Sequence, residues 1–418
     1  MGLKIGKYIF DNVHGHIGIT KTEERVIDSI IFQRLRNIRQ TGCVDFVYPG
    51  AVHTRFSHCI GTMYLMGRFL STARKNGEQM AQDDDQVEVL RLAALLHDIG
   101  HYPLSHTTEQ VVVRALDGPT HEMFGVTMIK RFLEEELSNY RVSEITDIIE
   151  KKKSSSMTML LSSAFDVDKC DYLLRDSYYT GVSYGEIEVD RLIQTMYIED
   201  GKMIFDKDET ELERFLLGRY HMYRAVYHHK TVVGFEEMVK RAFEFLVKEG
   251  QLRSPKELIK DGTETEIYGY NDAMFYQKVL EYSEKGVDRN LKELCGNIIR
   301  RKPAAVAYME PKPIAGSKMP VIEKRIASME SNDRERSKFA EECGIDPMWI
   351  FPTSLRRLSL VDEKSDIYIK KGDDIKSLRE SDTLILKMIG SNAMHDVRLY
   401  TKPGHQKTVS KLLHKRDY

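Results

Sequence analysis

The sequence predicts a mainly α-helical protein that begins with a short β-hairpin and ends in a small α+β region. Three observations support this fold class. Apolar residues recur at three- and four-residue spacing from about residue 23 to about residue 250, as in helices with one buried face. Alternating, β-branched residues precede this stretch, and strand-like segments separated by Pro and Gly follow it.

The first predicted element is a hairpin within "GKYIFDNVHGHIGIT", where the residues alternate. The predicted helices then follow in order, in "VIDSIIFQRLRNIRQ", "RFSHCIGTMYLMGRFLSTARK", "QVEVLRLAALLHDIG" and "LERFLLGRYHMYRAVYHHK". The polar tract "KKKSSSMT" at 151–158 is predicted to be a loop between helices.

The helical pattern weakens after Gly250. "PAAVAYMEPKPIAGSKMP" is predicted to be a connection, "DIYIKKG", "TLILKMI" and "DVRLYTK" are predicted strands, and "KTVSKLLHK" is a predicted last helix. We therefore predict a helical core at 1–250, a helical extension at 251–300 and a small α+β region at 301–418.

Composition narrows the setting. A chain of 418 residues is long enough for one large core and a smaller one. The net charge of -2 gives no global attraction to anionic membranes or nucleic acid, so nucleic-acid binding stays an open question. The five cysteines are scattered without a CxxC pair, and no apolar run is long enough for a signal peptide or a membrane span. We therefore expect a cytoplasmic protein with no membrane partner.

The stretch "LRLAALLHDIGHYPLSH" is apolar over two helical turns and then brings four chemically active side chains close together: His97, Asp98, His101 and His106. A His-Asp pair alone carries little information, because the same pair recurs at His395 and Asp396 in a strand-like segment. A lone histidine on such a helix is more often a hydrogen-bonded core or surface residue than a ligand.

Two other segments offer partners for this group. His58 follows Arg55 by three residues on one helical face, and Asp168 is followed at four-residue steps by Tyr172 and Asp176. Two imidazoles and two carboxylates suit a divalent ion such as Fe, Mn, Co or Zn, and they leave coordination positions open for water and substrate. The spacing therefore predicts a metal site at the end of a buried helix.

Six segments together resemble, in order and spacing, the HD-domain deoxynucleoside triphosphate triphosphohydrolases. They are "FQRLRNIRQTG", "VYPGAVHTRFSHCIG", "ALLHDIGHYPLSH", "HEMFGVTMI", "FDVDKCDYLLRDSYYTG" and "RYHMYRAVYHHK". The resemblance covers roughly residues 5 to 235, so it implies that the core at 1–250 is an HD-domain catalytic core. The segment "HDIG" alone is shared by all HD phosphohydrolases, and the C-terminal third resembles the family only loosely.

The resemblance implies water attack at the α-phosphate of a dNTP, which releases a deoxynucleoside and tripolyphosphate. A bound metal would acidify water, and Mg²⁺ would bridge the phosphates. The implied metal ligands are His58, His97, Asp98 and Asp168. The implied acid that protonates the leaving oxygen is His106, supported by Glu109 one helical turn further on. His101 and His121 are implied to hold the phosphates.

The remaining substrate contacts are also implied by the resemblance. Arg55, Lys169 and Arg219 match phosphate contacts, since guanidinium groups fit phosphate oxygens. Gln40, Tyr172, Asp176 and Tyr227 match contacts to the sugar, where Tyr227 would crowd C2′ and exclude a ribose hydroxyl. Without the resemblance, a tyrosine at helical spacing is more often a core residue.

The chain also departs from the vertebrate sterile-alpha-motif/HD-domain member of the family. Glu109 replaces Asp, Thr41 replaces a Leu that contacts the base, and Cys170 replaces Trp. The first change moves the acid group by a methylene, and the second leaves the base preference open.

A regulatory site is implied at the N-terminal end of the core, where Lys7, Asp28, Gln33 and Arg36 match residues that hold an activating guanine nucleotide between subunits. We therefore expect a GTP or dGTP effector and a homo-oligomer, either a dimer or a tetramer. Arg191 matches a second regulatory contact only with a one-residue gap. The alternative is an amphipathic helix whose charged face is simply solvated.

Two rival functions stay open at this point. One is an HD phosphohydrolase that acts on nucleoside monophosphates or on 3′ ends of single-stranded nucleic acid, and Arg219 and Tyr227 argue against it. The other is a catalytically weak nucleotide-sensing scaffold, and the intact ligand set argues against that. The sequence leaves the physiological metal, the preferred base and the oligomer size undetermined.

Overall fold

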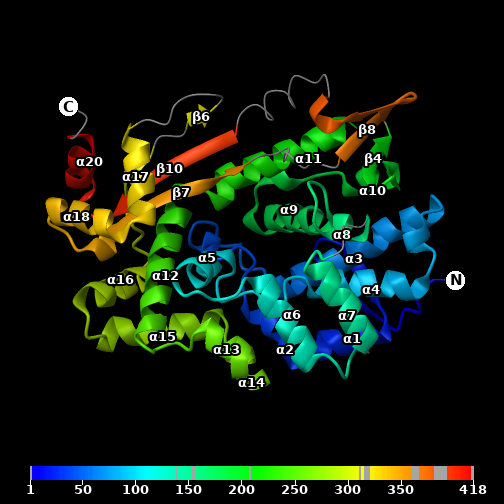
Figure 1. Ribbon diagram of the computed structural model, residues 1–418, viewed down its shortest axis with the longest axis horizontal. Helices are drawn as coiled ribbons and strands as arrows, with labels where there is room; N and C mark the ends of the chain where they lie inside the picture. The colour runs from blue at the N-terminus through cyan, green and yellow to red at the C-terminus, as the bar shows by residue number, and fades with distance from the viewer. Residues whose placement is uncertain are drawn as a thin grey trace.

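The computed structural model describes residues 2–137, 139–152, 156–206, 209–309, 312–314, 321–358, 367–380 and 393–415. Helices make up most of the molecule, as Figure 1 shows, so the predicted mainly α-helical class is confirmed. One large apolar core runs through the helical part of the chain, and a smaller one lies among the C-terminal elements.

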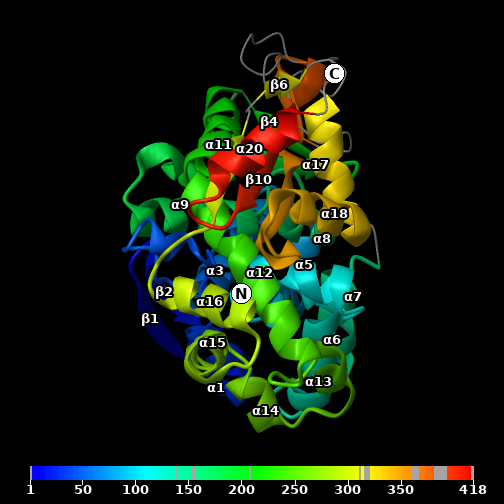
Figure 2. The ribbon, with the colours of Figure 1, turned by 90° about the vertical axis from the view of Figure 1, so that its left-hand side faces the viewer.

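The predicted N-terminal hairpin is confirmed and lies at one side of the molecule (Figure 2). Strand β1 (Lys7–Asp11) pairs antiparallel with β2 (Gly15–Ile19). Gly15 has a φ of +71°, a conformation that glycine adopts without steric cost, and it allows the tight turn. The carboxylate of Asp11 accepts from the backbone N–H groups of Val13 and His14, which closes this turn.

The predicted helix in "VIDSIIFQRLRNIRQ" is wrong as a continuous element. Helix α1 (Lys21–Asp28) ends at Ser29, whose backbone is extended. The Ser29 hydroxyl then caps the short α2 (Ile30–Gln33), which continues into the 3-10 helix η1 (Arg34–Asn37). Serine favours such cap positions because its oxygen satisfies an otherwise free N–H group.

The other predicted core helices are confirmed. The apolar face of each contributes to the main core. The elements of this part are η2 (Val44–Phe46), α3 (Arg55–Lys75), η3 (Gln79–Ala81), α4 (Asp84–Leu96), α5 (His106–Ala115), α6 (His121–Phe132), α7 (Asn139–Ile149), α8 (Ser156–Leu161), α9 (Val167–Thr180), η4 (Ser183–Gly185), α10 (Val189–Thr195), α11 (Glu209–Met222), the π-helical turn η5 (Tyr223–Tyr227) and α12 (Lys230–Lys248). Helix α8 begins inside the tract predicted to be a loop, so that prediction is wrong from residue 156 onward.

A second hairpin interrupts the stretch predicted to be helical. Strand β3 (Met196–Glu199) pairs antiparallel with β4 (Lys202–Asp206). Strand β4 also pairs in parallel with β8 (Ile367–Lys371), and β8 pairs antiparallel with β9 (Asp374–Ser377). The predicted strand in "DIYIKKG" is therefore confirmed, and it forms one sheet with strands from the helical part of the chain.

The segment 251–300 contains four helices in the lower part of Figure 1, of which α13 packs against α6 and α14 against α2. Helices α15 and α16 form an antiparallel pair, and both contact α12. The four helices are α13 (Pro255–Asp261), α14 (Glu264–Gly269), α15 (Asp272–Lys285) and α16 (Arg289–Ile299).

Over its described residues, the C-terminal region combines a sheet with α-helices. Its elements are β5 (Ala305–Met309), β6 (Lys312–Ile314), α17 (Val321–Ser331), α18 (Asp333–Cys343), η6 (Pro347–Trp349), β7 (Ile350–Leu358), η7 (Leu378–Glu380), β10 (Ala393–Thr401) and α20 (Gln406–His414). The predicted strand in "DVRLYTK" and the last helix are confirmed. The predicted connection at 303–320 is wrong where β5 and β6 form, and "TLILKMI" lies outside the described residues.

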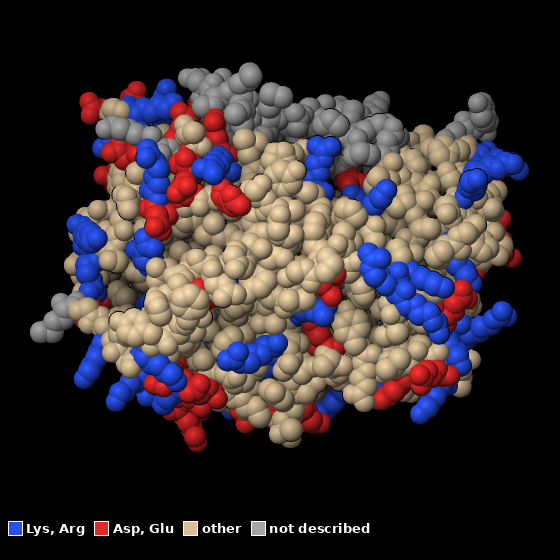
Figure 3. Space-filling view, turned by 180° about the vertical axis from the view of Figure 1, so that it is seen from behind, with Lys and Arg blue, Asp and Glu red and all other residues tan. Residues whose placement is uncertain are grey.

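The surface and the cysteines agree with the composition. Basic and acidic side chains are interspersed on the face shown in Figure 3. All five cysteines are free and buried. Within the described ranges, the structure contains no helix with the length and apolar character needed to cross a membrane.

Candidate functional site

Three helices bring imidazole and carboxylate side chains together in the interior. His58 lies in the first turn of α3, His97 caps the C-terminal end of α4, and Asp168 lies in the first turn of α9. One potential ligand atom from each of these residues lies within 4.8 Å of the other two. Asp98 directly follows His97. Its Oδ1 lies 3.4 Å from His97 Nε2, and its Oδ2 lies 3.5 Å from His58 Nε2.

The hydrogen bonds of the two imidazoles leave one nitrogen of each ring free. His97 Nδ1 lies 2.8 Å from the Ala94 carbonyl oxygen, and His58 Nδ1 lies 2.7 Å from Asp171 Oδ2. Since both partners accept, each Nδ1 donates its proton, and Nε2 is the ring atom that can bind an ion. Both Nε2 atoms are buried and make no hydrogen bond within the described residues. This arrangement fits a divalent transition metal, for which neutral imidazole Nε2 is a usual ligand.

The charges in this pocket favour a cation. Burial opposes ionisation of Asp168, but the adjacent imidazoles of His58 and His97 hold the pKa of its carboxyl well below the usual value. Burial also opposes a charge on His58, but Asp168 and Asp171 raise the pKa of this imidazole to about 10. The carboxylates therefore stabilise positive charge between them, which is what a divalent ion supplies.

The loop from residue 98 to residue 105 is held by hydrogen bonds with Asp272 and Arg34. Leu104 and Ser105 have φ values of 59° and 57°, a strained conformation for residues other than glycine. The Leu104 N–H donates to Asp272 Oδ1 at 2.7 Å, and buried Arg34 donates to the carbonyl oxygens of Ile99 and His101. These contacts fix the backbone that positions the histidines of the loop.

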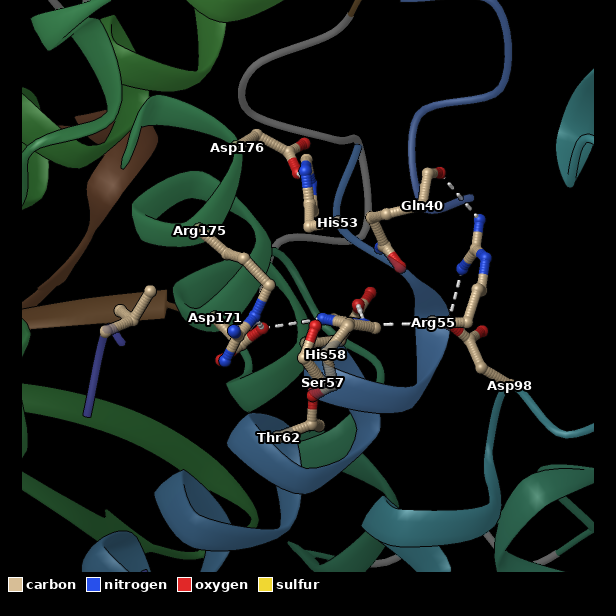
Figure 4. Close-up of polar contacts among 12 residues, drawn as sticks. Gln40, His53, Arg55, Ser57, His58, Thr62, Asp98, Asp171, Arg175 and Asp176 are labelled. Atoms are coloured by element: carbon tan, nitrogen blue, oxygen red, sulfur yellow. Dashed lines mark hydrogen bonds and ion pairs between the residues drawn. The ribbon is translucent and has the colours of Figure 1, made fainter. Parts of the chain in front are cut away.

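Arg55 connects this loop to the candidate metal ligands. Its guanidinium forms an ion pair with Asp98, and Nε donates to Ser105 Oγ at 2.9 Å. A third nitrogen donates to the backbone oxygen of Gln40 at 3.3 Å, and the side chain is buried. Figure 4 shows Arg55 and Asp98 on one side of His58 and Asp171 on the other. The structure thus places Arg55 against protein groups at the edge of the metal pocket.

A second histidine cluster lies beside the first. It contains His101, His106, Glu109 and His121, with potential ligand atoms within 4.8 Å of one another. The rings of His101 and His121 stack with centroids 4.0 Å apart, and His101 Nε2 lies 3.1 Å from Asp98 Oδ1. A Cβ on Gly100 would lie 2.0 Å from the His121 carbonyl oxygen, so glycine at this position permits the close approach of α6.

Glu109 organises the outer part of this cluster. One of its oxygens lies 2.9 Å from His106 Nδ1, and the other lies 2.6 Å from His121 Nδ1. Burial opposes its ionisation, but these two hydrogen bonds hold the pKa of the Glu109 carboxyl well below its usual value. An ionised carboxylate only accepts, so His106 and His121 both donate through Nδ1. The Nε2 atom of His106 remains available for another partner.

Two basic residues lie near the same end of α9. Lys169 Nζ donates to the buried Asp166 at 2.7 Å, and Asp166 also caps the helix by accepting from the Lys169 N–H. The Arg219 guanidinium lies over the Tyr223 ring, and its Nε is buried without a hydrogen bond to any described residue. An unsatisfied guanidinium nitrogen suits an anionic ligand.

A buried polar group lies two turns further along α9. Asp176 accepts from His53 Nε2 at 2.6 Å and from the Tyr227 hydroxyl at 2.5 Å. The Tyr227 ring makes an edge contact with Tyr172. The side-chain oxygen of Gln40 is buried without a partner in the described structure. All four residues predicted to contact a sugar therefore lie on elements around α9, and His53 joins them.

Sequence reasoning missed several residues of this region. His53 positions Asp176, and both Asp171 and Arg175 lie on the side of His58 away from Asp98 (Figure 4). Asp171 was visible as a carboxylate three residues after Asp168 on the same helix. The ion pairs that give these residues their roles depend on tertiary packing, which sequence spacing does not show.

The residues matched to a regulatory site lie around α1, α2 and β1. Lys7 forms a 3.1 Å ion pair with Glu24, and Arg36 donates to the Gln33 side chain at 2.7 Å while lying over the Phe56 ring. Asp28 lines an open depression of about 590 Å³, which is also lined by Lys21, Glu24, Arg25, Ser29 and Glu136.

Comparisons with known proteins give the relationships of this chain. Residues 55–176 match the HD domain, and residues 187–281 match the HD-associated region. The chain is 36% identical over 382 residues to an uncharacterized protein of Methanocaldococcus jannaschii, covering 90% of this chain and 76% of the relative. It is 32% identical over 275 residues to the deoxynucleoside triphosphate triphosphohydrolase SAMHD1 homolog of Dictyostelium discoideum, covering 61% of this chain and 53% of that protein.

Solved structures share the fold over nearly the whole chain. A phosphohydrolase from Bacteroides thetaiotaomicron superposes with a TM-score of 0.75 at 27% identity, covering 95% of this chain and all of that chain. A hypothetical protein from Aquifex aeolicus superposes with a TM-score of 0.73 at 26% identity, covering 97% of this chain and 99% of that chain.

Proposed function

The chain belongs to the HD-domain phosphohydrolase family, and we propose that it is a metal-dependent triphosphohydrolase that converts dNTPs to a deoxynucleoside and tripolyphosphate. The observation that carries this proposal is the row of residues along one face of α9. Asp168 lies in the metal pocket, and Asp176 lies eight residues, or about 12 Å, further along the helix. Phosphate chemistry at one end and sugar recognition at the other fit a nucleotide lying along this row.

The metal ligands in this proposal are His58, His97, Asp98 and Asp168, and the ion is Fe, Mn, Co or Zn. Such an ion, with Mg²⁺ on the phosphates, would acidify the attacking water and neutralise phosphate charge. Two observations support these ligand positions. The Nε2 atoms of His58 and His97 are buried without a hydrogen bond, and the carboxylates of Asp98 and Asp168 lie 3.5 and 3.0 Å from His58 Nε2.

His106 is the proposed acid for the leaving 5′ oxygen. The Glu109 carboxylate accepts the hydrogen bond from His106 Nδ1, so a proton on His106 Nε2 can be donated to the leaving oxygen. His101 and His121, stacked beside it, are proposed to contact phosphate oxygens together with Lys169 and Arg219. We also propose phosphate contact for Arg55, which in this structure is bonded to Asp98 and Ser105.

The substrate class can be tested directly. Purified protein supplied with Mn²⁺ and Mg²⁺ is incubated separately with each common dNTP and NTP, and product formation is measured. Faster turnover of the dNTPs supports the proposal. Turnover confined to nucleoside monophosphates or to single-stranded nucleic acid would contradict it.

Sugar selectivity is expected to depend on the ring of Tyr227. Tyr227→Ala should narrow the preference for dNTPs over NTPs by about tenfold or more, because a ribose hydroxyl then fits at C2′. Tyr227→Phe is the matched control, since it keeps the ring and removes only the hydrogen bond to Asp176. Steady-state kcat/KM for paired substrates such as dGTP and GTP measures both variants. An equal loss on both substrates in Tyr227→Ala would limit the residue to packing.

We further propose that a guanine nucleotide bound near Asp28 and Arg36 activates the enzyme and joins subunits into a dimer or tetramer. The open depression at Asp28 offers carboxylates that can accept from a guanine edge, and Arg25 and Lys21 add positive charge to its rim. An effector of this kind would favour the assembly that binds it best.

The double change Asp28→Ala and Arg36→Ala is expected to remove activation by GTP or dGTP. Wild type should hydrolyse a dNTP faster and sediment as a larger species when the effector is added, and the double variant should show neither response. Hydrolysis rates and sedimentation are measured for both proteins with and without effector. Identical rates and sizes in all conditions would leave an unregulated hydrolase.

A further inference from the structure

The buried carboxylate of Asp171 lies at the centre of a network that joins the N-terminal hairpin to the metal pocket. Its Oδ2 accepts from His58 Nδ1 at 2.7 Å, and its Oδ1 accepts from His14 Nε2 at 2.7 Å. Arg175 binds both oxygens, with nitrogen–oxygen distances of 2.9 and 3.0 Å. Asp171 therefore receives hydrogen bonds from a metal ligand, from the hairpin and from its own helix.

The hairpin makes a second connection to the same network. Arg175 donates to both oxygens of Asp11 at 2.8 and 3.1 Å, and Asp11 closes the turn that carries His14. The His14 ring also packs against Tyr64 of α3, and its side chain is only 6% exposed. His14 is thus held in one orientation from two sides.

The adjacent helix leaves room for this network at one position. A Cβ on Gly61 would lie 1.9 Å from Asp171 Oδ1 and 2.5 Å from an Arg175 nitrogen. Gly61 lies three residues after His58, so it is on the same side of α3 as this metal ligand. Only glycine allows Asp171 to approach His58 so closely without displacing the Arg175 guanidinium.

We propose that His14 is a positioning residue for the metal centre, which acts through Asp171 on the orientation of His58. The His14 N–H holds one carboxylate oxygen in place, so that the other meets His58 Nδ1 and directs Nε2 into the pocket. Partners of this kind fix the tautomer and the ring orientation of metal-binding histidines. The inference rests on the proposed function only for the ligand role of His58, and it requires no particular nucleotide substrate.

The test is a titration of metal-free protein with Co²⁺ or Mn²⁺ in the absence of nucleotide. His14→Leu removes the donor at similar size, His14→Gln keeps a side-chain N–H, and His16→Ala alters an exposed residue of the same hairpin. Loss of a residue that hydrogen-bonds a metal ligand directly typically weakens metal binding 10- to 100-fold. Because His14 acts one step further out, through Asp171, we expect His14→Leu to bind about tenfold more weakly, at the lower end of this range. His14→Gln should stay within about threefold of wild type, and His16→Ala should match wild type.

Equal affinities for His14→Leu and His16→Ala would overturn the proposal, and so would equal weakening in the Leu and Gln variants, which would indicate packing alone. A second measurement covers the case in which His14→Leu does not fold. In wild type, the His14 and His58 ring protons should give downfield, slowly exchanging resonances, because both point at a buried carboxylate. Rapid exchange of the His14 proton would also overturn the proposal. Neither measurement depends on dNTP turnover, which decides the proposed function separately.

Discussion

Asp168→Ala is expected to yield a folded protein that retains no transition metal and hydrolyses no dNTP at a measurable rate. The carboxylate lies 3.0 Å from His58 Nε2 and 3.7 Å from His97 Nε2, so its removal opens the ligand set. Transition-state stabilisation by a metal amounts to several kcal/mol, which corresponds to a loss of roughly 10³-fold or more. Folding should survive because the helix is capped by Asp166 and not by Asp168.

Metal content by elemental analysis, turnover and circular dichroism are measured on the same preparation. His97→Ala should behave in the same way, and Asp190→Ala is the matched control, since its carboxylate is largely exposed and pairs with Arg68 at the surface. Full activity in a metal-stripped Asp168→Ala protein would remove this residue from the metal site.

Glu109→Gln is expected to reduce kcat by about 10²- to 10⁴-fold while metal binding is retained, which is the usual contribution of a positioned acid or base. The carboxylate holds His106 and His121 by hydrogen bonds of 2.9 and 2.6 Å. A neutral amide can satisfy only one of these rings as an acceptor, and it no longer stabilises a protonated His106. The acid would then be both misplaced and less often charged.

Glu109→Asp keeps the charge and should recover a large part of the activity, because only one methylene is lost. Gln110→Ala changes the next, exposed residue of α5 and serves as the control for damage to the helix. Steady-state kinetics and metal content are compared across the three variants. If Glu109→Gln and Gln110→Ala had the same kcat, Glu109 would have no part in the reaction.

Much of the helical fold could be predicted because its signals are local. The periodicity of α3 and α4 and the alternation in β1 and β2 identified these elements. The break at Ser29 was missed because apolar periodicity continues across it, although serine is a common cap residue. Strands β5 and β6 were missed because they pair with β10, far along the chain, and the local sequence is rich in Pro and Gly.

The candidate site shows the same division. His97, Asp98, His101 and His106 were found because they follow one buried helix within a few residues. His53 and His14 were missed because each acquires its role from a carboxylate on α9 that is distant in the sequence. His53 lies 123 residues from its partner Asp176, and His14 lies 157 residues from its partner Asp171. No periodicity links such pairs, so only the tertiary structure reveals them.

The central claim is that water attacks the α-phosphate of a dNTP and that the 5′ oxygen leaves. The most direct measurement is turnover of dGTP in water labelled with a heavy oxygen isotope, with all products identified by mass spectrometry. We predict one labelled oxygen in tripolyphosphate and none in the deoxynucleoside. Labelled dGMP with pyrophosphate, or labelled orthophosphate with dGDP, would contradict the account.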